Sequence, residues 1–307
     1  MSETIGSLLG IRSRGVGEYD MGEVIVSVKF WVSVLGLVVA STILGSSMAY
    51  AGGGGAAEPR DTAGLFRSGI WYLRSSNDPA CASPQINVGG FGASTDIPLA
   101  RDFDGDGIDQ ITVFRTTAGF GEFFTVTDNP PAAPGAILQT SFGAPGDLPV
   151  IGDFDTATPG DEVGIYRPST QEFFLDDGGP SPLSFGFGDA GDVPIAGNWD
   201  NSADGSDEVG VYRASDNTFY LRADNIPGAS SVDARPMGAA GDLGVVGDFD
   251  RDGRTTIGVF RGVGFGGWFL NNMATGQGVD VQLNYGAGTD VPAMGDWDGP
   301  SVDEAGC

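Results

Sequence analysis

A triplet of the form acid–aromatic–acid recurs along this chain and constrains its fold more than any other feature. The five copies follow one another at steps of 51, 45, 50 and 48 residues. They are Asp102-Phe103-Asp104, Asp153-Phe154-Asp155, Asn198-Trp199-Asp200, Asp248-Phe249-Asp250 and Asp296-Trp297-Asp298, the third with Asn as its first residue. A period near 48 residues, filled with short apolar runs, is typical of β-propellers, in which each repeat forms one blade.

Three more features keep the same period. Each unit contains an apolar run that ends in aromatic-Arg, then an aromatic run, then an aromatic-Gly corner with an Asp six residues before the next triplet; in the fourth copy of the corner, Met replaces the aromatic residue. The arginines are Arg67, Arg115, Arg167, Arg213 and Arg261, and the corner aspartates are Asp96, Asp147, Asp192, Asp242 and Asp290. Together with the apolar run that leads into the triplet, these features predict four strands per unit, here called A, B, C and D in chain order.

The phase of the repeat predicts how the ring closes. The repeats begin with a strand B at residues 65–67 and end with a strand A at residues 292–298. A first blade built from residues 64–92 plus that last strand A would leave no open sheet edge at the closure. We therefore expect an all-β, five-bladed propeller of four-stranded antiparallel blades. A β-solenoid is the structural alternative, although its repeats are usually shorter.

The amino terminus predicts export. Lys29 precedes an apolar run at residues 30–44, and Ala49-x-Ala51 forms a small-residue cleavage pattern. We expect a secretory signal over residues 1–51, with Met21 as an alternative start, a Gly-rich spacer over residues 52–61 and the propeller over residues 62–307. A retained membrane anchor is the alternative, for which the run is short. The mature protein is then secreted, extracellular or at the cell surface, or periplasmic, with no membrane span.

Composition excludes several classes of function. With 41 Asp and Glu against 15 Lys and Arg, the net charge is −26, which argues against nucleic acid and anionic membrane surfaces as partners. The absence of histidine excludes Ser-His-Asp and Cys-His catalysis and His-ligated metal sites. Cys81 and Cys307 are too few for a structural zinc site. Both are expected on one face of the closing blade, which is compatible with a disulfide in an exported protein.

The triplets open acidic loops between strands A and B that suit calcium, a cation that takes six to eight oxygen ligands. The first and fourth loops hold a full Asp-x-Asp-x-Asp-Gly set, and the third holds a longer, partial one. The predicted ligands are Asp102, Asp104, Asp106 and Asp109, then Asn198, Asp200 and Asp204, then Asp248, Asp250 and Asp252. Gln110 or Thr256 could add an oxygen. The second and fifth loops lack the third acid, and we expect turns without metal there.

The recurring arginines and aromatic residues have two readings each. One Arg and one corner Asp per unit predict charge-paired structural hydrogen bonds, against the alternative of an anion-binding ring. The aromatic strands predict packing between blades, against the alternative of a platform for sugars.

Two stretches carry a family resemblance. Residues 142–155 (FGAPGDLPVIGDFD) and 247–261 (GDFDRDGRTTIGVFR) resemble FG-GAP and VCBS-type repeats, the broad kind found in the integrin α-chain propeller. The resemblance covers residues 62–307. It implies a β-propeller whose acidic loops bind calcium, in a bacterial secreted or surface protein with an adhesive or unknown role. The chain departs from integrin-like propellers in its count, since it shows five units where they have seven blades.

Two classes of function follow. The first is an exported, non-catalytic, calcium-stabilised module that binds an extracellular glycan or protein, which the unequal B–C connections at residues 116–122, 168–172 and 262–267 support. The alternative is a carbohydrate-active enzyme, a glycoside hydrolase or lyase. Its candidate carboxylates outside the repeat positions are Glu122, Glu172 and Asp233, and no two of them suggest a catalytic pair, so we expect no enzyme. A fragment of a larger surface protein is a third reading.

Overall fold

The computed structural model describes residues 61–79, 86–130, 135–155, 157–200, 205–273 and 278–298. These residues form twenty β-strands, and none of them belongs to a helix long and apolar enough to cross a membrane. The predicted signal, the spacer apart from Asp61, both cysteines and Asp204 lie outside the described residues.

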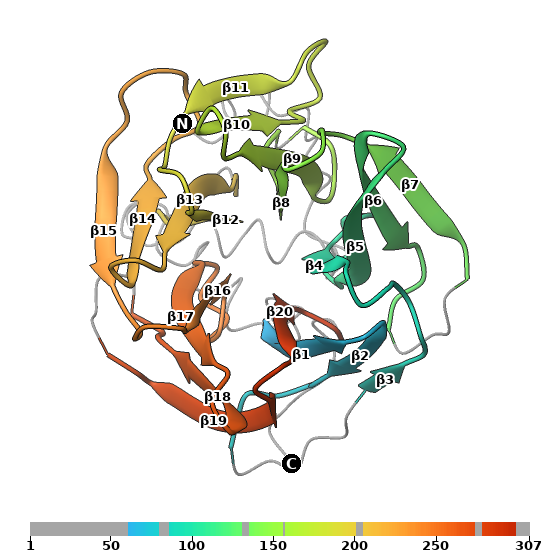
Figure 1. Ribbon diagram of the computed structural model, residues 1–307, viewed down its shortest axis with the longest axis vertical. Coiled ribbons are helices and arrows are strands. Elements are labelled where there is room, and N and C mark those ends of the chain that lie inside the picture. The colour runs from blue at the N-terminus through green and yellow to red at the C-terminus, as the bar shows by residue number, and fades with distance from the viewer. Residues whose placement is uncertain are drawn as a thin grey trace, which may run out of the picture. The chain divides into compact units, whose positions relative to one another are not determined.

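The strands form five four-stranded antiparallel sheets arranged in a ring, which confirms the predicted fold class (Figure 1). From the innermost strand outward, blade 1 is β20 (Val291–Gly295), β1 (Thr62–Arg67), β2 (Ile70–Leu73) and β3 (Ile86–Val88). Blade 2 is β4 (Ile97–Arg101), β5 (Gln110–Thr117), β6 (Phe120–Val126) and β7 (Ile137–Ser141). Blade 3 is β8 (Leu148–Gly152), β9 (Glu162–Arg167), β10 (Glu172–Leu175) and β11 (Leu183–Gly186). Blade 4 is β12 (Val193–Gly197), β13 (Glu208–Arg213), β14 (Thr218–Arg222) and β15 (Val232–Pro236), and blade 5 is β16 (Leu243–Gly247), β17 (Thr256–Arg261), β18 (Phe265–Leu270) and β19 (Val281–Ala287).

The ring closes in blade 1, as predicted. The last strand, β20, pairs antiparallel with β1, with Gly295 opposite Thr62 and Val291 opposite Phe66. The indole of Trp297, just beyond β20, is fully buried and donates a hydrogen bond to the carbonyl oxygen of Thr62 at 3.1 Å. The innermost strands β20, β4, β8, β12 and β16 contact one another in this order around a central channel.

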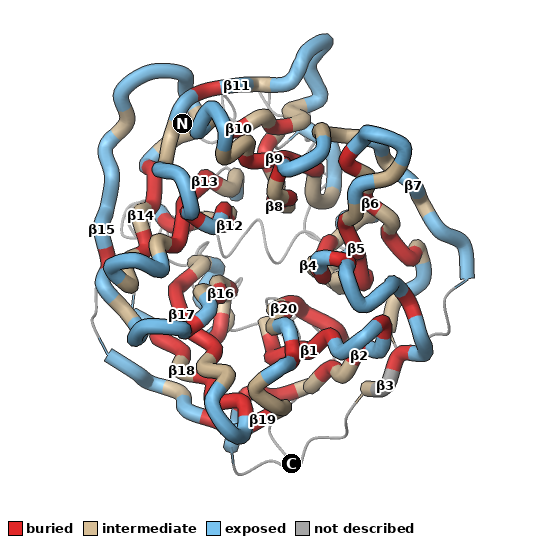
Figure 2. The backbone as a smooth tube through the Cα atoms, viewed as in Figure 1, coloured by how far each residue is buried: buried red, intermediate tan, exposed pale blue. Residues whose placement is uncertain are grey.

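The hydrophobic core is divided into five clusters, one between each pair of neighbouring blades. Phe114 and Phe123 of blade 2, for example, pack with Val163 and Ile165 of blade 3. Figure 2 shows the buried residues on the inner strands, whereas outer strands such as β7 and β15 are largely exposed. The aromatic C strands therefore pack between blades, as predicted. Since no blade buries its apolar side chains alone, the ring must form as a whole.

Different connections between strands form the two faces of the propeller, which we call the loop face and the corner face. The loop face carries the A–B loops, such as residues 102–109, and the C–D connections. The corner face carries the B–C turns, such as residues 118–119, and the D–A corners, such as residues 91–96. A hydrogen bond from the amide of Phe91 to the carbonyl of Gly69 at 2.8 Å joins a D–A corner to a B–C turn.

The recurring arginines hold the corner face together. In blade 3, Asp147 accepts hydrogen bonds from the amide of Ala144 (2.8 Å) and from Nε and Nη2 of Arg167 (2.9 and 2.8 Å). The Arg167 guanidinium also lies over the Phe174 ring, 4.5 Å from its centroid. The five pairs are Arg67–Asp290, Arg115–Asp96, Arg167–Asp147, Arg213–Asp192 and Arg261–Asp242. The predicted structural pairing is confirmed.

Candidate functional site

The first acidic loop folds around the side chain of Asp102. Its carboxylate accepts hydrogen bonds from the amides of Gly105 (2.8 Å), Asp106 (3.2 Å) and Gly107 (3.0 Å). Gly105 and Gly107 have φ angles of 73° and 81°, a region that glycine adopts without strain. This turn brings one carboxylate oxygen each from Asp102, Asp104 and Asp106 within 4.8 Å of one another. Three hard oxygen donors that converge in this way suit Ca²⁺.

The fourth loop repeats this arrangement. One oxygen of Asp248 accepts the amides of Asp250, Arg251 and Asp252, and the other accepts the amide of Gly253 at 2.8 Å. Oxygens of Asp248, Asp250 and Asp252 again lie within 4.8 Å of one another. Burial raises the pKa of Asp248 to about 6, although the four amide donors oppose the shift. A bound cation would favour the ionised carboxylate.

The second loop contains an acidic group that the sequence analysis missed. Asp155 accepts the amides of residues 157 and 158, so the expected turn is present. Glu162, however, joins Asp153 and Asp155 within the same 4.8 Å limit. It is the first residue of strand β9, and Thr158 donates hydrogen bonds to both Asp155 and Glu162 at 3.0–3.2 Å. The third acid comes from strand B, at the repeat position that Gln110 and Thr256 occupy elsewhere.

The remaining predicted ligands do not join these groups of carboxylates, or lie partly outside the described residues. Asp109 stands apart from the group in its loop, because its carboxylate accepts the amide of Asp296 at 2.7 Å. Gln110 supports the loop backbone by accepting the amide of Phe103 at 2.7 Å, and Thr256 donates to the carbonyl of Gly247 at 3.2 Å. In the third loop, Asn198 and Asp200 are described, but Asp204 lies outside the described residues.

Asp109 belongs instead to a ring of residues that precede strand B in each blade. Its amide donates to the carbonyl of Asp296 at 2.6 Å while its carboxylate accepts the amide of that same residue. The same reciprocal pair of hydrogen bonds joins every blade to the next. The five pairs are Asp109 with Asp296, Asp161 with Asp102, Asp207 with Asp153, Thr255 with Asn198, and Asp61 with Asp248. We call Asp61, Asp109, Asp161, Asp207 and Thr255 the channel ring.

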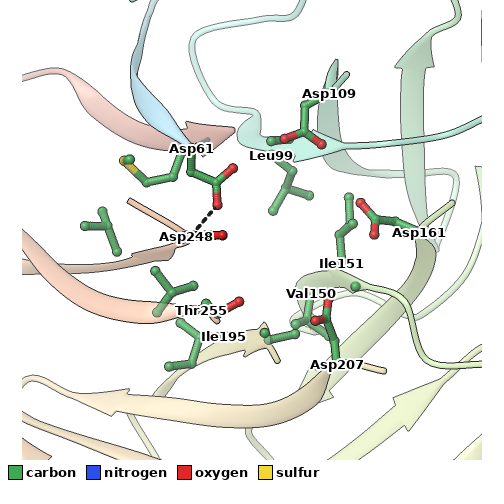
Figure 3. A pocket seen from close by; sticks show the side chains of 18 of the residues that line it. Asp61, Leu99, Asp109, Val150, Ile151, Asp161, Ile195, Asp207, Asp248 and Thr255 are labelled. Atoms are coloured by element: carbon green, nitrogen blue, oxygen red, sulfur yellow. Dashed lines mark hydrogen bonds between the residues drawn. The ribbon is translucent and has the colours of Figure 1, made fainter. Parts of the chain in front are cut away.

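The channel ring surrounds the mouth of the central channel at the loop face. Figure 3 shows its side chains around a cavity of about 530 Å³ whose wall also includes aliphatic residues of the innermost strands, such as Leu99 and Ile195. Burial, together with the neighbouring carboxylates, raises the pKa of Asp61 and of Asp161 to about 7. The pKa values of Asp109 and Asp207 are also raised well above the usual range, again mainly by burial.

The carboxylates considered for catalysis lie in three different blades. Glu122 of blade 2 accepts hydrogen bonds from Gln139 and Ser141 in the same sheet. Asp233 of blade 4 forms an ion pair with Arg235 at 2.7 Å. Glu172 of blade 3 begins β10. Each therefore belongs to the surface of its own blade.

Comparisons of the chain with protein-family models, with curated proteins and with solved structures find no match.

Proposed function

We propose that this chain is an exported, non-catalytic β-propeller of the FG-GAP and VCBS repeat kind that calcium stabilises and that binds an extracellular glycan or protein. The observation that carries the proposal is the convergence of three carboxylates in each of the loops that begin at Asp102 and Asp248. Each loop joins an innermost strand to the next strand of its blade. A cation bound there would fix the loop face of the propeller.

The chemistry of the loops supports calcium over other cations. The donors are carboxylate oxygens, which suit hard cations, and the described residues contain no histidine and no cysteine that could bind softer metals. The side chains of Asp104, Asp106, Asp250 and Asp252 are exposed. An exposed site has room for the additional water ligands that calcium takes. Sites of this kind fill at the millimolar calcium concentrations outside cells.

Thermal unfolding with and without calcium tests the stabilising role. We expect calcium to raise the melting temperature of the secreted protein, and magnesium at equal concentration to raise it less, because Mg²⁺ demands a stricter octahedral geometry. The matched variant Asp104→Ser/Asp250→Ser changes one exposed ligand in each loop and should lose most of the calcium effect. An identical melting temperature in calcium and in chelator would overturn the proposed role of the loops.

A second experiment separates binding from catalysis. The folded protein is applied to a glycan array in calcium and in chelator, and the same glycans are incubated with it and assayed for new reducing ends. Calcium-dependent retention without new reducing ends supports a binding module. New reducing ends would favour the alternative, a glycoside hydrolase, and unsaturated sugar products would favour a lyase.

A further inference from the structure

The corner face is uneven, because three neighbouring blades carry exposed apolar residues at their B–C turns. Phe120, the first residue of β6, is 59% exposed, and Val263 and Phe265, in and just after the turn between β17 and β18, are 80% and 84% exposed. Ile70, which begins β2 in the blade between them, is also exposed. We call these four residues the apolar patch. In blades 3 and 4 the matching turns read PSTQ (168–171) and ASDN (214–217), so the patch breaks the repeat.

Close contacts connect the turn of blade 5 to blade 1. A Cβ atom on Gly262, at the base of the β17–β18 turn, would lie 2.6 Å from the carbonyl oxygen of Gly288. Gly288 belongs to the corner that leads to Asp290, and Asp290 binds Arg67 at the end of β1. Ile70 follows Arg67 by three residues. The turns of blades 5 and 1 therefore lie against the same corner.

A similar connection joins blade 1 to blade 2. The carbonyl of Gly69 accepts the amide of Phe91, which begins the corner that leads to Asp96. Asp96 in turn binds Arg115 of β5 at 2.5 Å. Phe120 begins β6, directly after the two-residue turn that follows β5. The apolar patch thus runs over adjoining segments of blades 5, 1 and 2, which lie side by side in Figure 1.

Exposed guanidinium groups accompany the patch. The side chains of Arg67, Arg115 and Arg261 are at least 35% exposed, whereas the aspartates that pair with them are almost completely buried. Arg67 and Arg261 use Nε and Nη2 for these pairs, so Nη1 of each remains for another acceptor. In the polar half of the face, Arg213 also binds the exposed carboxylate of Asp189 at 2.7 Å, whereas among the described residues Arg167 pairs with Asp147 alone, as Arg67 does with Asp290.

We propose that the apolar patch is the docking site for a protein segment that presents apolar side chains flanked by carboxylates. The inference rests on the proposed binding function and locates it on the corner face of blades 5, 1 and 2. Exposed apolar residues grouped on one side of a protein mark interaction surfaces. Guanidinium donors with buried counter-charges favour carboxylate acceptors at the rim of such a surface.

Charge argues against a second copy as the occupant. A second copy that docked patch to patch would bring the exposed arginines of both copies together, and like charges disfavour such an isologous contact.

A random library of 12-residue peptides displayed on phage tests the proposal without a presumed ligand. It is selected on the wild-type protein in calcium and counter-selected on the Phe120→Ser/Phe265→Ser variant. We expect the enriched peptides to combine apolar residues with Asp or Glu, and to bind the double variant at least tenfold more weakly than the wild type when made synthetically. Enrichment of Lys and Arg, or equal binding to both proteins, overturns the proposal.

A matched control variant is Ile226→Ser. Ile226 is an exposed apolar residue in the C–D connection of blade 4, on the loop face, and should leave peptide affinity unchanged. Circular dichroism of all three proteins verifies the fold, and the single variants Phe120→Ser and Phe265→Ser replace the double variant if it unfolds. A tenfold loss of affinity in Ile226→Ser, or no enriched peptide at all, contradicts the patch as a peptide site.

Two further measurements identify other occupants. Binding to vesicles of phosphatidylcholine with phosphatidylglycerol that Phe120→Ser/Phe265→Ser removes would assign the patch to lipid. Dimers in sedimentation velocity that the same variant removes would assign it to a second copy. Both results overturn the proposal. The proposed function fails separately, because an identical melting temperature in calcium and in chelator would overturn calcium stabilisation whatever the peptide selection shows.

Discussion

Asp61 and Asp248 bind each other twice, although 187 residues separate them in the chain. The amide of Asp61 donates to the carbonyl of Asp248 at 2.9 Å, and the amide of Asp248 donates to the Asp61 carboxylate at 2.8 Å. One residue thus joins blade 1 to blade 5 and also places its carboxylate on the channel. The backbone geometry of a five-blade ring holds acidic side chains close together, and this has consequences for stability.

Without calcium, the protein should become less stable as the pH rises from 5 to 8. Burial raises the folded-state pKa of Asp61 and Asp161 from 3.8 to about 7. Between pH 4 and 7 the folded state therefore binds more protons than the unfolded state, and the free energy of unfolding falls as the pH rises. No histidine titrates in this window. We expect melting temperatures measured in chelator to fall by on the order of 5 °C between pH 5 and pH 8.

The variant Asp61→Asn/Asp161→Asn should flatten this dependence. The amide oxygen of Asn can still accept the amides of Asp248 and Asp102, but it carries no charge. Asp233→Asn is the matched control, because that carboxylate is 57% exposed and lies outside the channel. If the melting temperature of the double variant falls with pH as steeply as that of the wild type, other groups cause the pH dependence.

Calcium should bind the fourth loop more tightly as the pH rises. Asp248 has a pKa of about 6, and a carboxylate must be ionised to bind calcium. At pH 5 protons compete with the cation, whereas at pH 8 they do not. We expect calcium affinity, measured by isothermal titration calorimetry, to rise from pH 5 to pH 8. An affinity that is constant or falls over this range would contradict Asp248 as a ligand.

Glu162→Gln should remove one calcium ion. Each of the three groups of carboxylates among the described residues predicts one bound ion, and the group of the second loop depends on Glu162 for its third carboxylate. Calorimetric stoichiometry should fall by one, while Glu172→Gln, at the start of β10 in the same blade, leaves it unchanged. Stabilisation by the remaining ions persists, at about 2.7 kcal/mol for a site when calcium is 100 times its dissociation constant. Equal stoichiometry in wild type and Glu162→Gln would limit the second loop to a structural turn.

The repeat alone predicted the fold, because the length of the repeat, the number of strands in it and the strand at which it begins and ends can all be read from residue types along the chain. Strand B ends at Arg67, Arg167, Arg213 and Arg261 as expected. In blade 2, β5 continues past Arg115 to Thr117 and forms a longer hairpin with β6. The hairpin ends in the two-residue turn Ala118-Gly119, in which both φ angles are positive, and the repeat pattern does not predict its length.

The acidic groups were predicted less completely, since spacing within a loop does not reveal partners from other segments. Asp102, Asp104 and Asp106 are close in sequence, and the structure brings them together. Glu162 comes from the following strand, and Asp109 turns to the next blade. The recurrence of Asp at 61, 109, 161 and 207, directly before strand B, was visible in the sequence. That these aspartates join neighbouring blades becomes apparent only when the strands are arranged in a ring.

Replacing Arg167 with Met should cost about 2 kcal/mol of unfolding free energy in urea denaturation. The change leaves the buried Asp147 carboxylate without its ion pair, and an uncompensated buried charge is costly. The variant Arg167→Met/Asp147→Asn should recover part of the loss, because it removes that charge. No recovery in the double variant would mean that packing of the Arg167 side chain dominates.

Closure of the ring can be tested with two glycines of blade 1. A Cβ atom on Gly64 in β1 would lie 2.9 Å from the Trp297 ring and 3.1 Å from the carbonyl oxygen of Ala293 in β20, so Gly64→Ala should force these strands apart. A Cβ atom on Gly89 would meet nothing within 4 Å. We expect Gly64→Ala to destabilise the protein by about 1–3 kcal/mol and Gly89→Ala to leave it unchanged or slightly more stable. Limited proteolysis should also cleave near β20 in Gly64→Ala first, because β20 is held to the ring by its pairing with β1. Equal melting temperatures for the two variants would show that the contact between β1, β20 and Trp297 is not what closes the ring.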